Sequence, residues 1–125
     1  MARFARRLES ELTRGRAFDC LVTGDAELRK LNREFRGKDY ASDVLSFPRV
    51  GDGLGDIAIS LARARSQARQ FGHATEMEIR ILMLHGVLHL MGFDHEIDAG
   101  RMALMEKRWR VRLGLPNGLI ERVRE

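Results

Sequence analysis

Apolar side chains recur three or four residues apart in five stretches of the chain, which is the spacing of one face of an α-helix. In the first stretch, for example, Phe4, Leu8 and Leu12 are four residues apart. The pattern predicts helices over residues 2–12, 26–35, 61–71, 76–91 and 98–113. The fourth is apolar on nearly every side after Ile81, as expected for a central helix that other elements surround.

Three short runs have the composition of β-strands instead. They cover residues 17–22, 44–47 and 55–59, and Pro48 ends the second because proline cannot donate a hydrogen bond within a sheet. Gly51 and Gly53 predict a hairpin turn between the second and third runs. We expect one domain over residues 1–125, of the α/β (α+β) class, with a small mixed sheet, one hairpin and helices around it.

Residues at the helix ends add further expectations. Asp25 and Ser60 are predicted to cap the helices that follow them. Thr75 and Glu78 are spaced as a capping box at the start of the fourth helix. Gly92 is expected to be the left-handed residue that ends this helix and lets the chain turn back.

The charge of the chain lies mainly in its arginines. The formal net charge is +4, and only three of the 22 Lys and Arg residues are lysines, so 19 are arginines. The planar guanidinium suits phosphate, which favours a nucleic-acid partner. A genome rich in G and C would also raise the arginine content, and composition alone does not separate the two explanations.

Cellular location is indicated by features that the sequence lacks. Cys20 is the only cysteine, so no internal disulfide can form and a reducing cytoplasm is expected. The charged start is not followed by the apolar stretch of a secretory signal. The longest apolar run, residues 79–93, is interrupted by Arg80 and two histidines and is too short for a membrane span. We therefore predict a cytoplasmic protein with no membrane partner.

Three of the four histidines, His85, His89 and His95, fall within eleven residues. Residues four apart on a helix differ by roughly 40° in direction and about 6 Å in height, so His85 and His89 can face one point. Gly92 ends the helix between them and His95, which lets the returning chain bring His95 within reach. A single histidine pair is more often part of a core or a surface. Here the pair lies on an apolar helix, where an unpartnered imidazole is costly.

The three histidines predict one metal ion per chain, held on the central helix. Three nitrogen ligands with an open fourth position are typical of a catalytic zinc site rather than a structural one. Imidazole also suits other first-row metals, so Zn²⁺ is the leading choice among several. The fourth histidine, His73, follows Gly72 at a helix junction and is expected to be a loop residue.

Residues 85–95 resemble the H-G-x-L-H-L-x-G-[YF]-D-H signature of the YbeY family of bacterial endoribonucleases and ribosomal RNA maturation factors. Residues 31–40, 42–48 and 55–60 resemble the same family, and the match extends from about residue 25 to 110. The resemblance implies a metal-dependent, single-strand-specific endoribonuclease that acts in 16S rRNA maturation and ribosome quality control. It also implies helices around a mixed four-stranded sheet.

One departure concerns the start of the chain. Members of the family usually have a strand before the first helix, whereas this sequence begins almost at that helix. Either the sheet has one edge strand fewer or the true start lies upstream.

The chemistry of the motif favours RNA over peptides. Metzincin proteases share the histidine spacing but carry a glutamate as general base where this chain has Gly86. Cleavage of RNA has different needs, because a metal can itself activate water and neutralise a phosphate oxygen. The resemblance marks Arg36 as the cation for the developing charge, although an ordinary surface arginine is the alternative. Asp94 is expected to orient a ligand imidazole or to act as a base.

Other roles and partners follow from the same reading. The expected partners are single-stranded RNA, namely the 16S rRNA precursor, and the ribosome or small-subunit assembly proteins, with no DNA. Ser46 and Asp56 lie in matched segments, with stabilisation of the hairpin as the alternative role. Two other functions stay open: a non-catalytic rRNA-binding assembly factor with a structural metal, and a metallohydrolase of peptides or amides. Three cations near Arg36 could extend a phosphate-binding surface: Arg29, Arg33 and Lys38.

Overall fold

The computed structural model describes residues 2–94 and 97–124. Its helices are α1 (Ala2–Glu11), α2 (Asp25–Arg36), α3 (Leu61–Phe71), α4 (Thr75–Leu90), α5 (Arg101–Arg112) and α6 (Leu119–Arg124). Its strands are β1 (Phe18–Thr23), β2 (Val44–Pro48) and β3 (Gly55–Ser60). Every predicted helix and strand is present, and the predicted fold class is confirmed. The short helix α6 was not predicted.

The strands form one mixed sheet in the order β1-β3-β2. Strand β1 is parallel to β3, and β2 is antiparallel to β3. The predicted hairpin joins β2 to β3, and both Gly51 and Gly53 have the positive φ expected of turn residues. The described residues form three strands, one fewer than the resemblance implies. The chain before β1 forms the helix α1 instead, whose Phe4 and Leu8 share one buried face.

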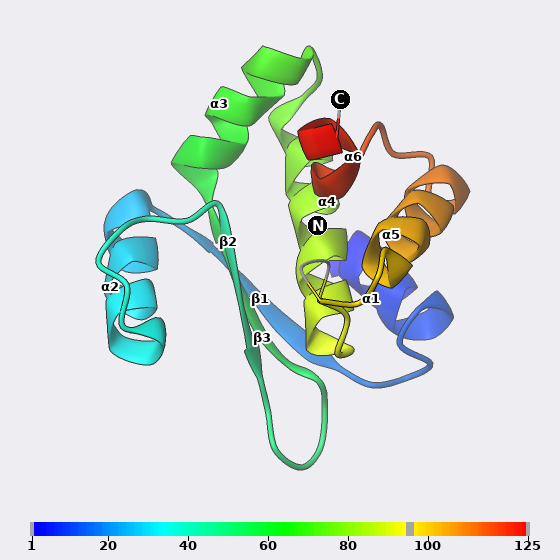
Figure 1. Cartoon of the computed structure of the whole chain (residues 1–125), viewed down its shortest axis with the longest axis horizontal. Coiled ribbons are helices and arrows are strands. Elements are labelled where there is room, and N and C mark those ends of the chain that lie inside the picture. Colours follow the sequence, from blue (N-terminus) through cyan, green and yellow to red (C-terminus); the bar gives the residue numbers. More distant parts are fainter. Residues whose placement is uncertain (1, 95–96, 125) are drawn as a thin grey trace.

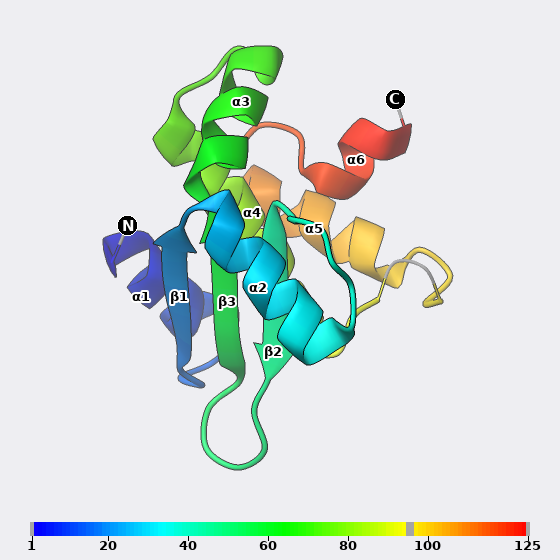
Figure 2. The same ribbon diagram turned by 90° about the vertical axis from the view of Figure 1, so that its left-hand side faces the viewer.

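Helices cover both faces of this sheet (Figure 1). Helix α2 lies on one side, and α4 lies on the other, with α1 and α5 beyond it. The view turned by 90° shows α2 crossing in front of the strands (Figure 2). Because side chains alternate along a strand, Ile57 and Ile59 pack in the large core on the α4 side. Leu45 and Ala58 pack in the smaller core with Leu28 of α2.

Helix α4 is the central element, as predicted from its apolar sequence. Eleven of its sixteen residues are buried. Its last turn closes with the N–H of Gly92 donating to the carbonyl of His89, and the N–H of Phe93 donating to that of Leu88. Gly92 has φ +99°, so the predicted left-handed end of this helix is confirmed.

Two of the predicted helix caps are wrong. Helix α2 is preceded by Gly24, and the carboxylate of Asp25 accepts instead from the Ser60 hydroxyl at 2.5 Å. Helix α4 is preceded by Ala74 without a side-chain cap, so Thr75 is its first helical residue. The expected partner Glu78 is fully buried and bonds to His73 and Arg122 instead. In both cases a distant polar partner competes successfully with the local backbone. The predicted cap at Ser60 is confirmed, because its hydroxyl accepts from the Arg63 N–H at 3.1 Å.

Within residues 2–94 and 97–124, no helix is both long and apolar enough to cross a membrane.

Candidate active site

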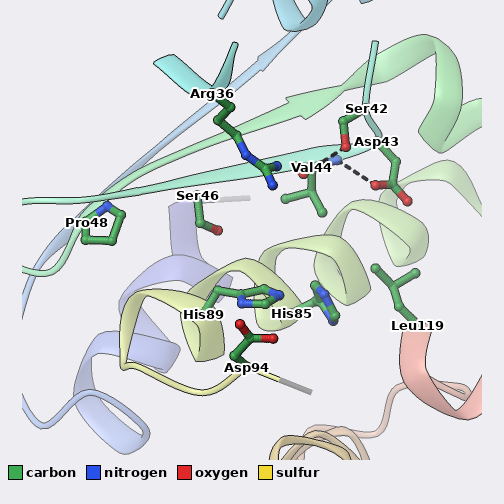
Figure 3. Close-up of a pocket in the computed structure, with 10 residues that line it drawn as sticks. All are labelled: Arg36, Ser42, Asp43, Val44, Ser46, Pro48, His85, His89, Asp94 and Leu119. Carbon is green, nitrogen blue, oxygen red and sulfur yellow. Dashed lines mark hydrogen bonds between the residues drawn. The ribbon is translucent and has the colours of Figure 1, made fainter. Parts of the chain in front are cut away.

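A pocket of about 440 Å³ opens between α4 and strand β2. Strand β2 contributes alternate residues, as a strand with one face toward a cavity must. The other walls come from the end of α2, the loop after it, the loop after α4 and helix α6. The lining residues are Arg36, Ser42, Asp43, Val44, Ser46, Pro48, His85, His89, Asp94 and Leu119 (Figure 3).

His85 and His89 lie one turn apart on α4, and both line the pocket. Their ring centroids are 4.8 Å apart, with 73° between the ring planes. His85 is buried and His89 is half-buried. The spacing expected from the sequence therefore does bring the two imidazoles together on one side of the helix, facing the same cavity.

The imidazole of His85 is held from behind by a carboxylate that the sequence analysis missed. Its Nδ1 lies 2.6 Å from Oε2 of Glu106, which comes from α5 and is 1% exposed. A hydrogen bond at Nδ1 assigns any metal-binding role to Nε2, the pattern common to metal-ligating histidines. A signal was present in the sequence: Glu106 falls on the apolar face of its helix, between Met102 and Trp109, where all three are buried.

The third predicted ligand, His95, lies outside the described residues. Among the residues that the structure does describe, no group of three or more His, Cys, Asp or Glu side chains is arranged to hold a metal. The three-histidine site therefore stays a prediction, of which the structure positions two members.

Asp94 follows α4 and lines the same pocket. Its carboxylate points toward the His89 imidazole (Figure 3). This position suits both roles predicted for it, orientation of an imidazole or uptake of a proton from substrate. The left-handed Gly92 makes it possible, because the chain reverses there and returns Asp94 along the helix end.

Arg36 enters the pocket from the opposite wall. It is the last residue of α2, and its guanidinium points down between Val44 and Ser46 toward the histidines (Figure 3). Gly37, with φ +69°, ends the helix directly after Arg36. The structure thus brings Arg36, Asp94, His85 and His89 to one cavity.

The neighbouring cations are arranged differently. The Arg29 guanidinium donates to both carboxylate oxygens of Asp39, at 2.8 and 3.0 Å, and Arg33 lies 3.9 Å from the same carboxylate. This arrangement raises the pKa of Arg29 and lowers that of Asp39, chiefly through the hydrogen bonds between them. Within residues 2–94 and 97–124, neither Arg36 nor Lys38 has an ion pair of this kind. Of these two cations, only Arg36 lines the pocket.

Gly86 faces the sheet and not the pocket's centre. A Cβ atom there would come within 3.0 Å of Ile57 Cγ2 and 3.2 Å of Ser46 Oγ. The hydroxyl of Ser46 donates to the Gly86 carbonyl at 3.0 Å and so joins β2 to α4. The missing side chain lets the histidine-bearing helix approach the sheet closely.

The two remaining candidates have structural contacts. Asp56 accepts from Arg49 at 2.8 Å across the hairpin, which supports its alternative role in stabilising that hairpin. His73 begins the turn before α4, and its Nε2 lies 2.6 Å from Oε1 of the buried Glu78. It lines no part of the pocket described above.

Comparisons with known proteins agree with one another. Residues 3–113 match the family model described as Endoribonuclease YbeY. A Solibacter usitatus protein of that name is 73% identical over 121 residues, which cover 97% of this chain and 82% of the relative. A Koribacter versatilis protein of the same name is 57% identical, over 82% of this chain and 68% of the relative. The solution structure of a Thermotoga maritima protein superposes with a TM-score of 0.59 at 28% identity, covering 86% of this chain and 79% of that one.

Proposed function

The chain belongs to the YbeY family of endoribonucleases, and we propose that it is a zinc-dependent, single-strand-specific endoribonuclease. Its proposed substrate is the 16S rRNA precursor, and its proposed roles are rRNA maturation and ribosome quality control. The observation that carries the proposal is the pocket itself, where two imidazoles and a carboxylate on one wall face an arginine on the other. That combination of groups suits a phosphodiester.

The metal would be held by His85, His89 and His95. The two described members are suited to this, because they lie one helical turn apart and a buried carboxylate orients one of them. Two imidazoles with a third nearby in sequence form a donor set that zinc prefers. When bound, the metal would supply Lewis-acid stabilisation of a phosphate oxygen and activation of a water molecule.

The other groups of the pocket act on the substrate directly. Arg36 would donate two parallel hydrogen bonds to the non-bridging oxygens of the scissile phosphate, since its planar guanidinium matches their geometry. Negative charge grows on these oxygens during the reaction, so the contact strengthens in the transition state. Asp94 would accept a proton or orient an imidazole, depending on where the substrate lies against it.

A peptidase role is disfavoured by the position of Gly86. The protease glutamate at the corresponding position is the general base, whereas here that position is packed against Ile57 and Ser46. A longer side chain would have to displace the side chains of Ile57 and Ser46. The described pocket offers no glutamate in its place.

The proposed partners and cellular location follow from the composition and charge of the chain. An arginine-rich chain with net charge +4 suits a polyanionic partner. We propose a cytoplasmic location and contacts with the ribosome or small-subunit assembly proteins, with no DNA substrate.

The first test measures metal content. Purified protein is expected to hold about one zinc per chain, and His85→Ala, His89→Ala and His95→Ala should each lose it, because two imidazoles do not close the site. His73→Gln is the matched control, since this histidine contacts Glu78 two helical turns before His85. Wild-type metal content in any two of the three alanine variants would overturn the assignment.

The second test separates an enzyme from a binding factor. Single-stranded fragments of the rRNA precursor are incubated with metal-loaded protein, with chelator-treated protein and with treated protein given zinc again. Loss of cleavage on chelation and its return with zinc are expected. Retained RNA binding with no cleavage in any sample would favour the non-catalytic assembly factor, and cleavage of a peptide panel would favour an amide hydrolase.

A further inference from the structure

Glu106 is hydrogen-bonded to two different parts of the molecule. Its Oε2 lies 2.6 Å from Nδ1 of His85, and its Oε1 accepts from the backbone N–H of Ile120 at 3.0 Å. With only 1% of its surface exposed, the carboxylate has these protein groups in place of water. One side chain therefore joins the histidine helix α4 to the start of the C-terminal helix α6.

The turn before α6 is shaped around the same carboxylate. A Cβ atom at Gly118 would come within 2.7 Å of Glu106 Cδ, and it would lie closer still to Oε1. Gly118 does not have a positive φ. Its lack of a side chain is therefore explained by the nearness of Glu106 and not by backbone conformation.

Helix α6 is also part of the pocket. Leu119, its first residue, lines the cavity with the two histidines. The helix has further anchors that do not touch the site. Arg122 donates to both oxygens of Glu78 on α4, and Arg110 of α5 donates to both oxygens of Glu121.

We infer that Glu106 is a positioning residue that holds His85 with Nδ1 protonated and Nε2 toward the metal. Only a carboxylate offers two acceptor oxygens at this reach. A glutamine offers one oxygen and one NH₂ group. In one orientation of its amide, the NH₂ group would face the Ile120 N–H, which is also a donor. In the other, the NH₂ group would face Nδ1 of His85, which would then have no acceptor for its proton. The inference rests on the proposed metal site, because His85 is taken as a ligand.

The experiment compares three variants of the full chain. Glu106→Gln removes one acceptor with almost no change of volume. Gly118→Ala keeps the carboxylate but places a methyl group against it, which is expected to shift the carboxylate away from His85. Glu121→Gln is the matched control, because it weakens a different anchor of α6 and has no contact with His85. Thermal melts establish that each variant is folded.

Zinc affinity is measured by competition with a chromophoric chelator. Glu106→Gln is expected to bind zinc about 10- to 100-fold more weakly, the usual effect of losing a carboxylate that orients a ligand imidazole. Gly118→Ala should be weakened in the same direction, and Glu121→Gln should stay within about threefold of the wild type. Equal affinity in Glu106→Gln and the wild type would overturn the inference while leaving the metal site intact.

A second readout needs no metal. In the metal-free protein at alkaline pH, the ¹⁵N shifts of the His85 ring report which nitrogen carries the proton. The Nδ1–H form is expected in the wild type and in Glu121→Gln, and a shift toward the Nε2–H form is expected in Glu106→Gln. If wild-type protein binds no zinc, the proposed function fails, but this measurement still decides whether Glu106 fixes the ring. An Nε2–H form in the wild type would overturn the inference.

Discussion

Removal of Arg122 is expected to cost the protein a large part of its stability. The Arg122 guanidinium donates to both Glu78 oxygens at 2.8 Å, and the side chains are 8% and 0% exposed. The variant Arg122→Met keeps an apolar stem against Phe71, whose ring centroid lies 4.1 Å from the guanidinium carbon. What it removes is the charge that faces a buried carboxylate.

The magnitude follows from the burial of Glu78. Breaking a buried ion pair by deleting one partner costs roughly 3–5 kcal/mol, since the other charge is left without compensation. We expect the lower end, about 3 kcal/mol, because His73 remains 2.6 Å from the same carboxylate. Release of α6 would also let water reach Glu78 and would limit the loss. For a chain of this size, about 3 kcal/mol corresponds to a fall of roughly 10 °C in the melting temperature.

Urea denaturation of a double-variant cycle measures the effect. The cycle compares Glu78→Met, Arg122→Met and the variant carrying both changes. Because replacing both partners of a buried pair with apolar groups is often close to neutral, the double variant should be more stable than either single one. Arg29→Ala, which breaks an exposed pair, is the control and should unfold close to the wild type. If Arg122→Met lost less than about 0.5 kcal/mol, or if the double variant were the least stable, the reasoning would be refuted.

Three further predictions concern other parts of the molecule. Arg36→Ala should keep metal and fold but slow RNA cleavage by about 10²-fold or more, with partial rescue by Arg36→Lys; wild-type rates would make this an ordinary surface residue. Gly86→Ala should lower stability by about 1–2 kcal/mol in urea, since crowding against the buried Ile57 outweighs the gain in helix propensity; a more stable variant would contradict this. Burial raises the pKa of Cys20 to about 11, so its alkylation should rise with pH only toward 11, and a rate that levels off near 9 would show an accessible thiol.

The sequence predicted those features whose cause is local. The histidine helix was recognisable because a long, mostly apolar run with a left-handed glycine near its end has few other structures available. The pair His85 and His89 followed from the helical repeat alone. The hairpin between β2 and β3 followed from its two turn glycines.

Features with a distant cause were missed or predicted wrongly. Asp25 and Glu78 look like helix-capping residues in the sequence, but each bonds to a side chain more than thirty residues away. Helix α6 has only six residues and too weak a pattern to be recognised without Arg122 and Glu78. The place of Arg36 in the pocket depended on the family resemblance, because nothing local directs its side chain.

The two buried glutamates show why a carboxylate on an apolar helix face is informative. Glu78 and Glu106 lie on different helices, both are nearly or fully buried, and both hold α6. Their second partners differ: Glu78 also bonds His73 outside the pocket, whereas Glu106 bonds His85 within it. Loss of Arg122 should therefore loosen α6 with little direct effect on His85, whereas loss of Glu106 should act on both. If zinc affinity fell equally in Arg122→Met and Glu106→Gln, docking of α6 itself, and not the hydrogen bond to His85, would control the metal site.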